Sequence, residues 1–261
     1  MLTRDQPHTV VMTACLRPEA QFVGRLNRVD PELRARDYLA GLDFWLQLPD
    51  PRITRIIFIE NTLAPLAVFE ARARTSNPHG RACEFISIDC NRTPPGLHYG
   101  YAEYRLMDEG LAQSRLFGES SHLIKATGRY RFPDISRLLN TVPPDYRVAA
   151  DARHNRWFVP KPLTMVTAPL FLATREFFEA HLRRVYRRLR PPPPWWGQFI
   201  EDAMYEELMP LRGQPGVILR WKVNCNPVGV GANGRTYDTP RKRLLSAARA
   251  VGRRLLPNWW F

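Results

Sequence analysis

Polar and charged side chains follow several short apolar runs of the sequence, at the positions where α/β proteins commonly bind ligands. The runs 9–15, 53–59, 84–88 and 121–126 lead into such side chains: Arg17, Glu60, Asn61, Asp89 and the segment 125–130. Carboxylates, a carboxamide and cations gathered in one place suit a charged, polar ligand. For a lone Asn or Asp after a strand, a turn or cap role is the commoner explanation. The prediction of a binding site therefore rests on the whole set.

The elements that must position these side chains alternate between strands and helices. The run 9–15 is apolar and β-branched, as is 53–59, and both patterns predict strands buried on both faces. Between them, Asp30 and Pro31 supply a cap and a first-turn proline for a helix that carries leucines on one face. A second helical pattern runs from 101 to 111, between the predicted strands 84–88 and 121–126.

This order predicts an α/β fold with a mostly parallel central sheet flanked by helices. Ligands of such sheets bind beyond the carboxyl ends of the strands. The length of 261 residues favours one main domain, which we place at 1–239, followed by a tail at 240–261. The four prolines at 191–194 predict a stiff connector within that domain.

Four segments resemble motifs of bacterial polysaccharide-assembly glycosyltransferases. They are Ile-Phe-Ile-Glu-Asn-Thr at 57–62, Gly-Tyr-Ala-Glu at 100–103, Ile-Lys-Ala-Thr-Gly-Arg-Tyr at 124–130 and Phe-Ile-Glu-Asp-Ala-Met-Tyr-Glu at 199–206. The chain departs from the group's pattern at Thr62, where Ser is usual, and at Ala102, where a second Gly is usual. The resemblance implies a GT-A-like, Rossmann-like fold and a nucleotide-sugar donor. It also implies a lipid-linked or oligosaccharide acceptor in the synthesis of capsule, lipopolysaccharide or O-antigen.

A nucleotide-sugar donor leaves as a phosphate anion, so the site must stabilise that charge with a metal or with fixed cations. Many GT-A enzymes carry Asp-x-Asp after the fourth strand, where this chain has Lys125, Gly128 and Arg129 instead. We therefore expect no metal ligand and no requirement for Mg²⁺ or Mn²⁺, although Asp151 offers a single carboxylate. The alternative is that Lys125 and Arg129 pair with acidic neighbours for structural reasons. The predicted donor-binding residues are Arg17, Glu60, Asn61, Asp89, Glu103, Lys125, Thr127, Gly128, Arg129, Tyr130, Asp151 and Arg153.

An inverting transfer needs a base that takes the proton of the acceptor hydroxyl. Glu201 and Asp202 are adjacent, so on a helix they point about 100° apart and one of them faces the site. The resemblance of segment 199–206 to the group's helix, and its late place in the chain, which is similar to that of the base of inverting GT-A enzymes, imply that Glu201 is the base. Asp202 and Glu103 are next in line, and an exposed helix carboxylate is the alternative. Trp195 and Trp196 are predicted to bind the acceptor sugar, or else to belong to the core.

The carboxyl end carries a basic amphipathic helix that begins at Pro240 after a Thr239 cap. Six Lys or Arg residues and no acid lie between 241 and 254, and the chain ends in Trp-Trp-Phe. Such a helix favours the headgroup region of an anionic membrane. A packed terminal helix with a solvated basic face is the alternative.

The net charge of +13 indicates an anionic partner, whether nucleic acid, acidic lipid or a phosphorylated small molecule. No zinc-finger spacing or RNA-recognition motif is present, which disfavours a basic nucleic-acid-binding protein, the second function considered. The four cysteines lack metal-ligand spacing, and we find no signal peptide or membrane-spanning run. We therefore expect a cytoplasmic protein, peripheral on the inner face of the cell membrane.

Overall fold

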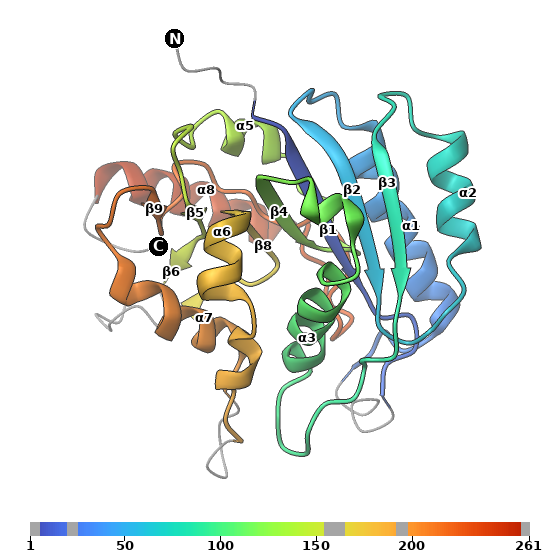
Figure 1. Cartoon of the computed structure of the whole chain (residues 1–261). Helices are drawn as coiled ribbons and strands as arrows, with labels where there is room; N and C mark the ends of the chain where they lie inside the picture. The colour runs from blue at the N-terminus through green and yellow to red at the C-terminus, as the bar shows by residue number, and fades with distance from the viewer. Residues whose placement is uncertain (1–5, 20–25, 154–164, 192–197, 257–261) are drawn as a thin grey trace.

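A computed structural model describes residues 6–19, 26–153, 165–191 and 198–256, and these residues form a central sheet with helices on both faces (Figure 1). Seven strands within them pair in the order β3-β2-β1-β4-β8-β5-β9. These are β1 (His8–Ala14), β2 (Ile53–Glu60), β3 (Ala82–Ser87), β4 (His122–Thr127), β5 (Val148–Ala149), β8 (Leu170–Thr174) and β9 (Val217–Ile218). Every pairing is parallel except those of β8, which runs antiparallel to both β4 and β5. The predicted α/β class with a mostly parallel central sheet is confirmed.

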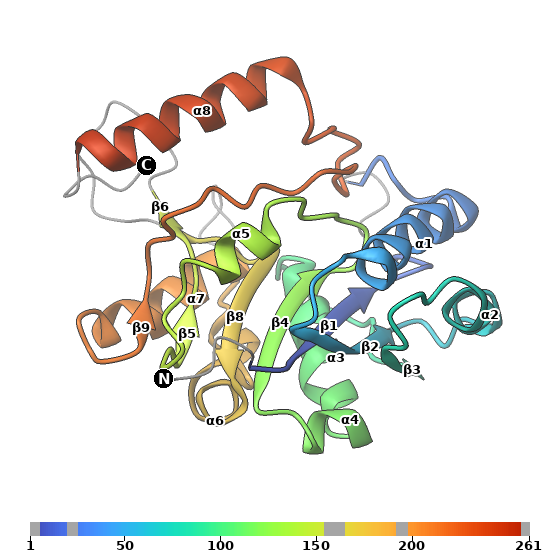
Figure 2. The same ribbon diagram turned by 90° about the horizontal axis from the view of Figure 1, so that it is seen from above.

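The helices cover the two faces of this sheet as separate layers. Their bounds are α1 (Pro31–Gln47), α2 (Ala67–Thr75), α3 (Gly100–Leu111), α4 (Arg115–Gly118), α5 (Ile135–Leu139), α6 (Arg175–Phe177), α7 (Ile200–Leu208) and α8 (Pro240–Leu255). Helices α1, α2 and α5 pack on one hydrophobic cluster, whereas α3, α4, α6 and α7 pack on the other. Figure 2 shows the two layers from above, with α8 outermost on the side of α1 and α5.

Successive side chains of the central strands point alternately toward the two helix layers. Val10 and Met12 of β1 lie in the cluster under α1, while Val11 lies in the cluster under α3. Since successive residues of a strand point to opposite faces, a strand buried on both faces must be apolar throughout. This explains the continuous apolar runs of β1 and β2.

Local sequence signals fix α1 at its amino end. The Asp30 side chain accepts hydrogen bonds from the backbone N–H groups of Glu32 and Leu33, and Pro31 occupies the first turn. The helix buries Tyr38, Leu42, Trp45, Leu46 and two further residues on one face.

Two glycines let α1 approach the end of β4 closely. A Cβ atom on Gly41 would overlap the carbonyl oxygen of Gly128, and a Cβ on Gly128 would lie 2.8 Å from the carbonyl oxygen of Thr13. The Gly128 N–H donates to that same Thr13 oxygen. The absence of side chains at both positions therefore sets where β4 ends relative to β1 and α1.

Several short elements also follow β4. Strands β6 (Ala152–Arg153) and β7 (Met165–Val166) form a two-stranded sheet, and single turns of π- or 3₁₀-helix occur at Phe178–Leu182, Val185–Arg188 and Met209–Leu211. Among the described residues, no helix is both long and apolar enough to cross a membrane.

Candidate active site

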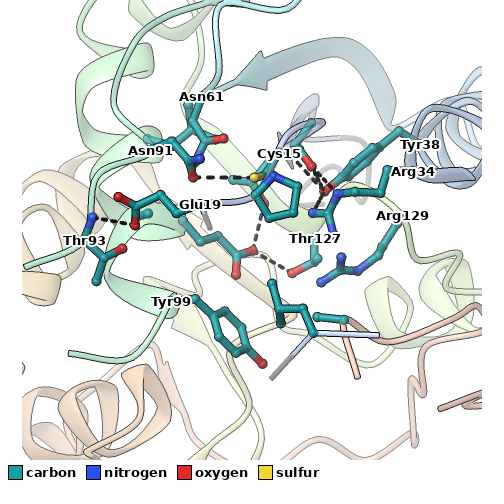
Figure 3. Close-up of a pocket in the computed structure, with 18 residues that line it drawn as sticks. Cys15, Glu19, Arg34, Tyr38, Asn61, Asn91, Thr93, Tyr99, Thr127 and Arg129 are labelled. Carbon is teal, nitrogen blue, oxygen red and sulfur yellow. Dashed lines mark hydrogen bonds between the residues drawn. The ribbon is translucent and has the colours of Figure 1, made fainter. Parts of the chain in front are cut away.

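A pocket opens at the carboxyl ends of β1, β2 and β4 (Figure 3). Its walls come from both helix layers and from the loops after the strands: Thr13, Ala14, Cys15, Pro18, Glu19, Leu26, Arg34, Tyr38, Asn61, Asn91, Thr93, Tyr99, Ala102, Glu103, Leu106, Thr127, Arg129 and Ala232. The strand order reverses between β1 and β4, so the pocket lies at the switch point where open α/β sheets bind ligands. Of the predicted residues, Asn61, Glu103, Thr127 and Arg129 line it.

Glu103, in the first turn of α3, lines the pocket. One of its oxygens, Oε1, accepts hydrogen bonds from Thr13 Oγ1 at 2.8 Å, Thr127 Oγ1 at 2.7 Å and Lys125 Nζ at 2.7 Å. Burial alone would raise the pKa of this carboxyl, but the Lys125 charge and the hydroxyl donors lower the pKa to about 2. Glu103 therefore stays ionised, and it joins the ends of β1 and β4 to α3.

Lys125 does not face the pocket. Its side chain is 1% exposed, and Nζ donates to Glu103 Oε1, to Thr127 Oγ1 at 3.0 Å and to the Ala168 carbonyl at 2.8 Å. An ammonium group has three donors, and all three are engaged. The structure therefore shows Lys125 paired with an acidic neighbour, Glu103, which was the structural alternative for this residue.

Glu60 ends β2 behind the pocket rather than in its wall. It is fully buried, and its carboxylate accepts from the backbone N–H groups of Leu16, Thr62 and Ala64. These bonds hold the loops after β1 and β2 against each other. Glu60 thus shapes the pocket without reaching into it.

Arg129 supplies positive charge to the pocket. It follows β4 directly, and Figure 3 shows its side chain among those lining the cavity, near Thr127. Within the described residues, its Nε and Nη1 atoms are buried and have no hydrogen-bond partner. Buried guanidinium donors without partners are costly, so an anion bound in the pocket would relieve that cost.

Carboxamides and a thiol form the opposite wall, after β1, β2 and β3. Asn61 Nδ2 donates to Asn91 Oδ1 at 3.1 Å, and Asn91 Nδ2 donates to the Arg17 carbonyl at 3.0 Å. Asn61 Oδ1 is buried without a partner among the described residues. Burial raises the pKa of the Cys15 thiol to about 11, so it stays protonated. This wall offers neutral hydrogen-bonding groups and the carboxylate of Glu19, which lies beside Asn91 and accepts from the Thr93 N–H at 3.1 Å (Figure 3).

The adjacent carboxylates of α7 take different roles. Asp202 Oδ2 accepts from the backbone N–H of Phe199 at 2.8 Å, so this side chain caps its own helix. Glu201 does not line the pocket, but its carboxyl interacts electrostatically with Glu103, which does, and with Lys125. Burial, followed by repulsion from Glu103, raises the pKa of Glu201 to about 7. A carboxyl that titrates near neutral pH is suited to proton transfer.

The hydroxyl of Tyr99 interacts electrostatically with both Arg129 and Glu201. The sequence patterns did not single out this residue. It lines the pocket at the amino end of α3. Burial raises the pKa of its hydroxyl to about 12, with Arg129 opposing and Glu201 adding to that shift. Asn91, Arg34 and Tyr38 were missed as well. Asn91 comes two residues after Asp89, so the rule of polar groups beyond strand ends reaches it.

Several predicted residues lie away from the pocket walls. Arg17 and Asp89 are exposed, and Tyr130 is buried against Phe132 and Tyr237. Gly128 serves the packing of α1 on β4, as described above.

Asp151 and Arg153 lie near α8. Both oxygens of the buried Asp151 accept from Arg253 Nη2, at 2.8 and 2.7 Å. Burial lowers the pKa of Arg153, whose charge interacts with Asp151, Arg253 and Glu201.

Trp195 and Trp196, the predicted acceptor residues, lie outside the described residues. Within the described ranges, no group of three or more His, Cys, Asp or Glu side chains is arranged to hold a metal ion.

Comparison with known proteins gives distant structural likenesses only. No family model matches the chain, and no curated protein matches it. A 4-diphosphocytidyl-2C-methyl-D-erythritol synthase from Anaerococcus prevotii superposes with a TM-score of 0.44 at 9% identity, covering 95% of this chain and 99% of that one. A protein described as a nucleotide-diphospho-sugar transferase from Desulfovibrio desulfuricans gives 0.42 at 13% identity, covering 79% and 77%. Mouse xyloside xylosyltransferase 1 gives 0.42 at 12% identity, covering 82% and 84%.

Proposed function

We propose that this chain is a GT-A-like glycosyltransferase that uses a nucleotide-sugar donor. The observation that carries the proposal is Arg129, whose Nε and Nη1 donors are buried without a partner among the described residues, in a pocket at the switch point of the sheet. Glu201, a carboxyl whose pKa lies at about 7, interacts electrostatically with Glu103 of that pocket. A donor that ends in a phosphate leaving group and an acceptor that loses a proton need one group of each kind.

The two walls of the pocket suggest how the donor lies. The wall of Cys15, Asn61 and Asn91, which also carries the Glu19 carboxylate, suits the nucleoside, whose base and ribose offer hydrogen-bond donors and acceptors. Arg129 would then contact the phosphates, and the sugar would lie toward Glu103 and Glu201. In this arrangement Lys125 and Glu60 act as positioning residues.

The proposed reaction is a single displacement at the anomeric carbon. Glu201 accepts the proton of the acceptor hydroxyl while the acceptor oxygen forms a bond to that carbon. The bond from the carbon to the phosphate oxygen breaks, and the electron pair leaves with the phosphate. Arg129 stabilises the added negative charge on the leaving group. The outcome would be inversion at the anomeric carbon.

We also propose that Arg129 supplies enough charge for turnover without a divalent cation. Activity should then survive treatment with EDTA. Loss of activity with EDTA and its recovery with Mn²⁺ or Mg²⁺ would instead assign a metal to the site.

The acceptor proposed is a lipid-linked or oligosaccharide glycan in the assembly of a bacterial surface polysaccharide, such as capsule or O-antigen, at the inner face of the cell membrane. The resemblance of segments 57–62, 100–103, 124–130 and 199–206 to polysaccharide-assembly enzymes supports this proposal.

Slow hydrolysis of the donor tests the function without knowledge of the acceptor. The purified chain is incubated with individual nucleotide sugars, and the released nucleotide is measured. We expect release from one donor class, and we expect Glu201→Gln to abolish it while donor binding persists. Failure to bind or cleave any nucleotide sugar would refute the proposal.

A further inference from the structure

Helix α8 presents its apolar side to solvent. Leu244 is 71% exposed, Val251 56% and Leu255 72%, and Leu245 and Ala248 are exposed as well. These five residues lie on one side of the helix, because successive residues of an α-helix are about 100° apart. A surface helix of a globular protein usually turns such a stripe toward the core.

The opposite side of α8 is polar, and this side holds the helix to the body. Ser246 Oγ accepts from Asn226 Nδ2 at 2.6 Å, and the Ser246 carbonyl accepts from Asn224 Nδ2 at 2.7 Å. Two turns further on, Arg253 donates to both oxygens of Asp151, and in this ion pair each side chain is 6% exposed. Arg253 Nη1 also donates to the Trp221 carbonyl at 2.9 Å. The polar contacts therefore fix the rotation of α8, with the leucines outward.

The positive charge around the apolar stripe of α8 indicates which kind of partner would bind there. Between 241 and 254 the helix carries six basic residues and no acidic one. Arg241 and Arg254 are exposed beside the apolar stripe, and the whole chain has a net charge of +13. A second copy of this chain would bring another basic helix against the first, which like-charge repulsion opposes. An anionic bilayer offers both acyl chains for the stripe and negative headgroups for its rim.

We infer that α8 is a docking surface for an anionic membrane, held at a fixed orientation by the Asp151–Arg253 ion pair. The apolar stripe enters the headgroup boundary while the polar side stays on the protein. The inference concerns where the chain binds rather than what it catalyses, so it does not depend on the proposed function.

The fixed orientation also relates the membrane to the pocket. The segment that leads into α8 contains Ala232, which lines the pocket, and the Ala232 carbonyl accepts from the backbone N–H groups of Asn27 and Arg28. In the same segment, Val228 forms an antiparallel β-bridge with Arg131, which lies two residues after Arg129 in the sequence. One short segment, fixed by these hydrogen bonds, thus joins the pocket to the docking surface. It would hold the pocket in a constant orientation relative to the bilayer.

The test compares two double variants of equal charge change. Leu244→Glu/Val251→Glu places acids on the outward stripe, and Ala40→Glu/Val68→Glu places them on exposed positions of α1 and α2. Co-sedimentation is measured with vesicles of phosphatidylglycerol and phosphatidylcholine and, separately, with phosphatidylcholine alone. Thermal unfolding is recorded for each protein to show that the fold is kept.

We expect the parent chain and the α1/α2 variant to bind the anionic vesicles, and the α8 variant to bind at least about tenfold more weakly with unchanged unfolding. Raising the salt concentration should weaken the parent's binding without abolishing it, because the apolar contribution is not screened. Equal binding by both variants would overturn the inference. The inference would also be overturned if the parent chain did not bind vesicles but sedimented as a dimer, and the α8 variant sedimented as a monomer. The apolar stripe would then pack against a second copy of the chain.

Discussion

The carboxyl of Glu103, in the pocket wall, and that of Glu201, on α7, have pKa values shifted in opposite directions because their neighbours differ. Glu103 receives a lysine and two hydroxyl donors, and its pKa falls to about 2. Glu201 is half-buried, and desolvation together with the charge of Glu103 raises its pKa to about 7. A pair of carboxyls whose pKa values are separated in this way divides the tasks of holding charge and moving a proton. In the proposed mechanism, Glu103 is therefore a structural anion and Glu201 the proton acceptor.

The pH dependence of transfer should follow the ionisation of Glu201. A base must be deprotonated, so kcat/KM should fall as the pH drops below about 7, with a slope of one proton. Glu201→Gln should lower turnover by about 10²- to 10⁴-fold and leave donor affinity unchanged. Initial rates across a pH series give the profile, and titration calorimetry gives the affinity.

The neighbouring carboxylate provides the control for that experiment. Asp202→Asn keeps an oxygen that can accept from the Phe199 N–H, so it should turn over at nearly the parent rate. If Asp202→Asn abolishes transfer and Glu201→Gln does not, the roles of the two residues are reversed.

Stability provides a second, independent readout of the Glu201 pKa. A raised carboxyl pKa contributes stability that is fully present below the unfolded-state value and is lost as the pH rises through about 7. Glu201→Gln cannot ionise, so its stability relative to the parent should increase as the pH passes through this range. No change in relative stability would mean that Glu201 has an ordinary pKa.

At the scale of elements, the contact between α1 and the end of β4 determines where Arg129 lies. Gly41→Ala would improve helix propensity, yet its Cβ would overlap the Gly128 carbonyl oxygen, which cannot move without moving β4. We expect a loss of about 1–3 kcal/mol in the free energy of unfolding, measured in urea. Gly118→Ala, whose Cβ meets nothing within 4 Å, should be neutral. Equal stability of the two variants would show that α1 and β4 are not in close contact.

The attachment of α8 should contribute substantially to stability. Arg253→Met leaves the buried carboxylate of Asp151 without its charged partner, so we expect a loss of about 3–5 kcal/mol. Arg254→Met, at the adjacent exposed position, should change stability by less than about 0.5 kcal/mol. Adding Asp151→Asn to Arg253→Met should recover part of the loss. Equal stability of Arg253→Met and Arg254→Met would indicate that α8 does not rest on Asp151.

Elements with local signals could be predicted from the sequence, and elements that depend on distant partners could not. Asp30 and Pro31 mark the start of α1, and Thr239 and Pro240 mark that of α8. In contrast, β5 and β9 have two residues each and exist only through their pairing in the sheet. The antiparallel direction of β8 is likewise invisible in a short apolar run.

The same distinction applies to the site. Asn61 and Arg129 were found because they follow strands. The burial of Lys125 could not be foreseen, since it depends on Glu103, which arrives from another helix. Tyr99 was missed because it precedes a helix, where no pattern marks a pocket residue.

At the scale of the whole molecule, the sheet places one pocket at its switch point, and α8 gives the chain an outward apolar side. The first half of the chain supplies most of the pocket wall, while α7, in the second half, supplies the candidate base. The proposed function requires both halves, because the nucleoside wall and Glu201 lie far apart in the sequence. A chain cut between them should neither bind nor transfer.

Titration calorimetry of nucleotide sugars with the parent chain, Arg129→Gln and Arg131→Gln shows whether Arg129 binds the phosphates of the donor. Arg131 is exposed and belongs to the same loop, so it controls for the loss of one charge. We expect the parent to bind one class of nucleotide sugar and its nucleoside diphosphate. We expect Arg129→Gln to weaken the binding of both by about 10- to 100-fold, the equivalent of one charged hydrogen bond, and Arg131→Gln to leave it unchanged. Equally strong binding by all three proteins, or no binding of any nucleotide sugar, would show that the pocket is not a donor site of this kind.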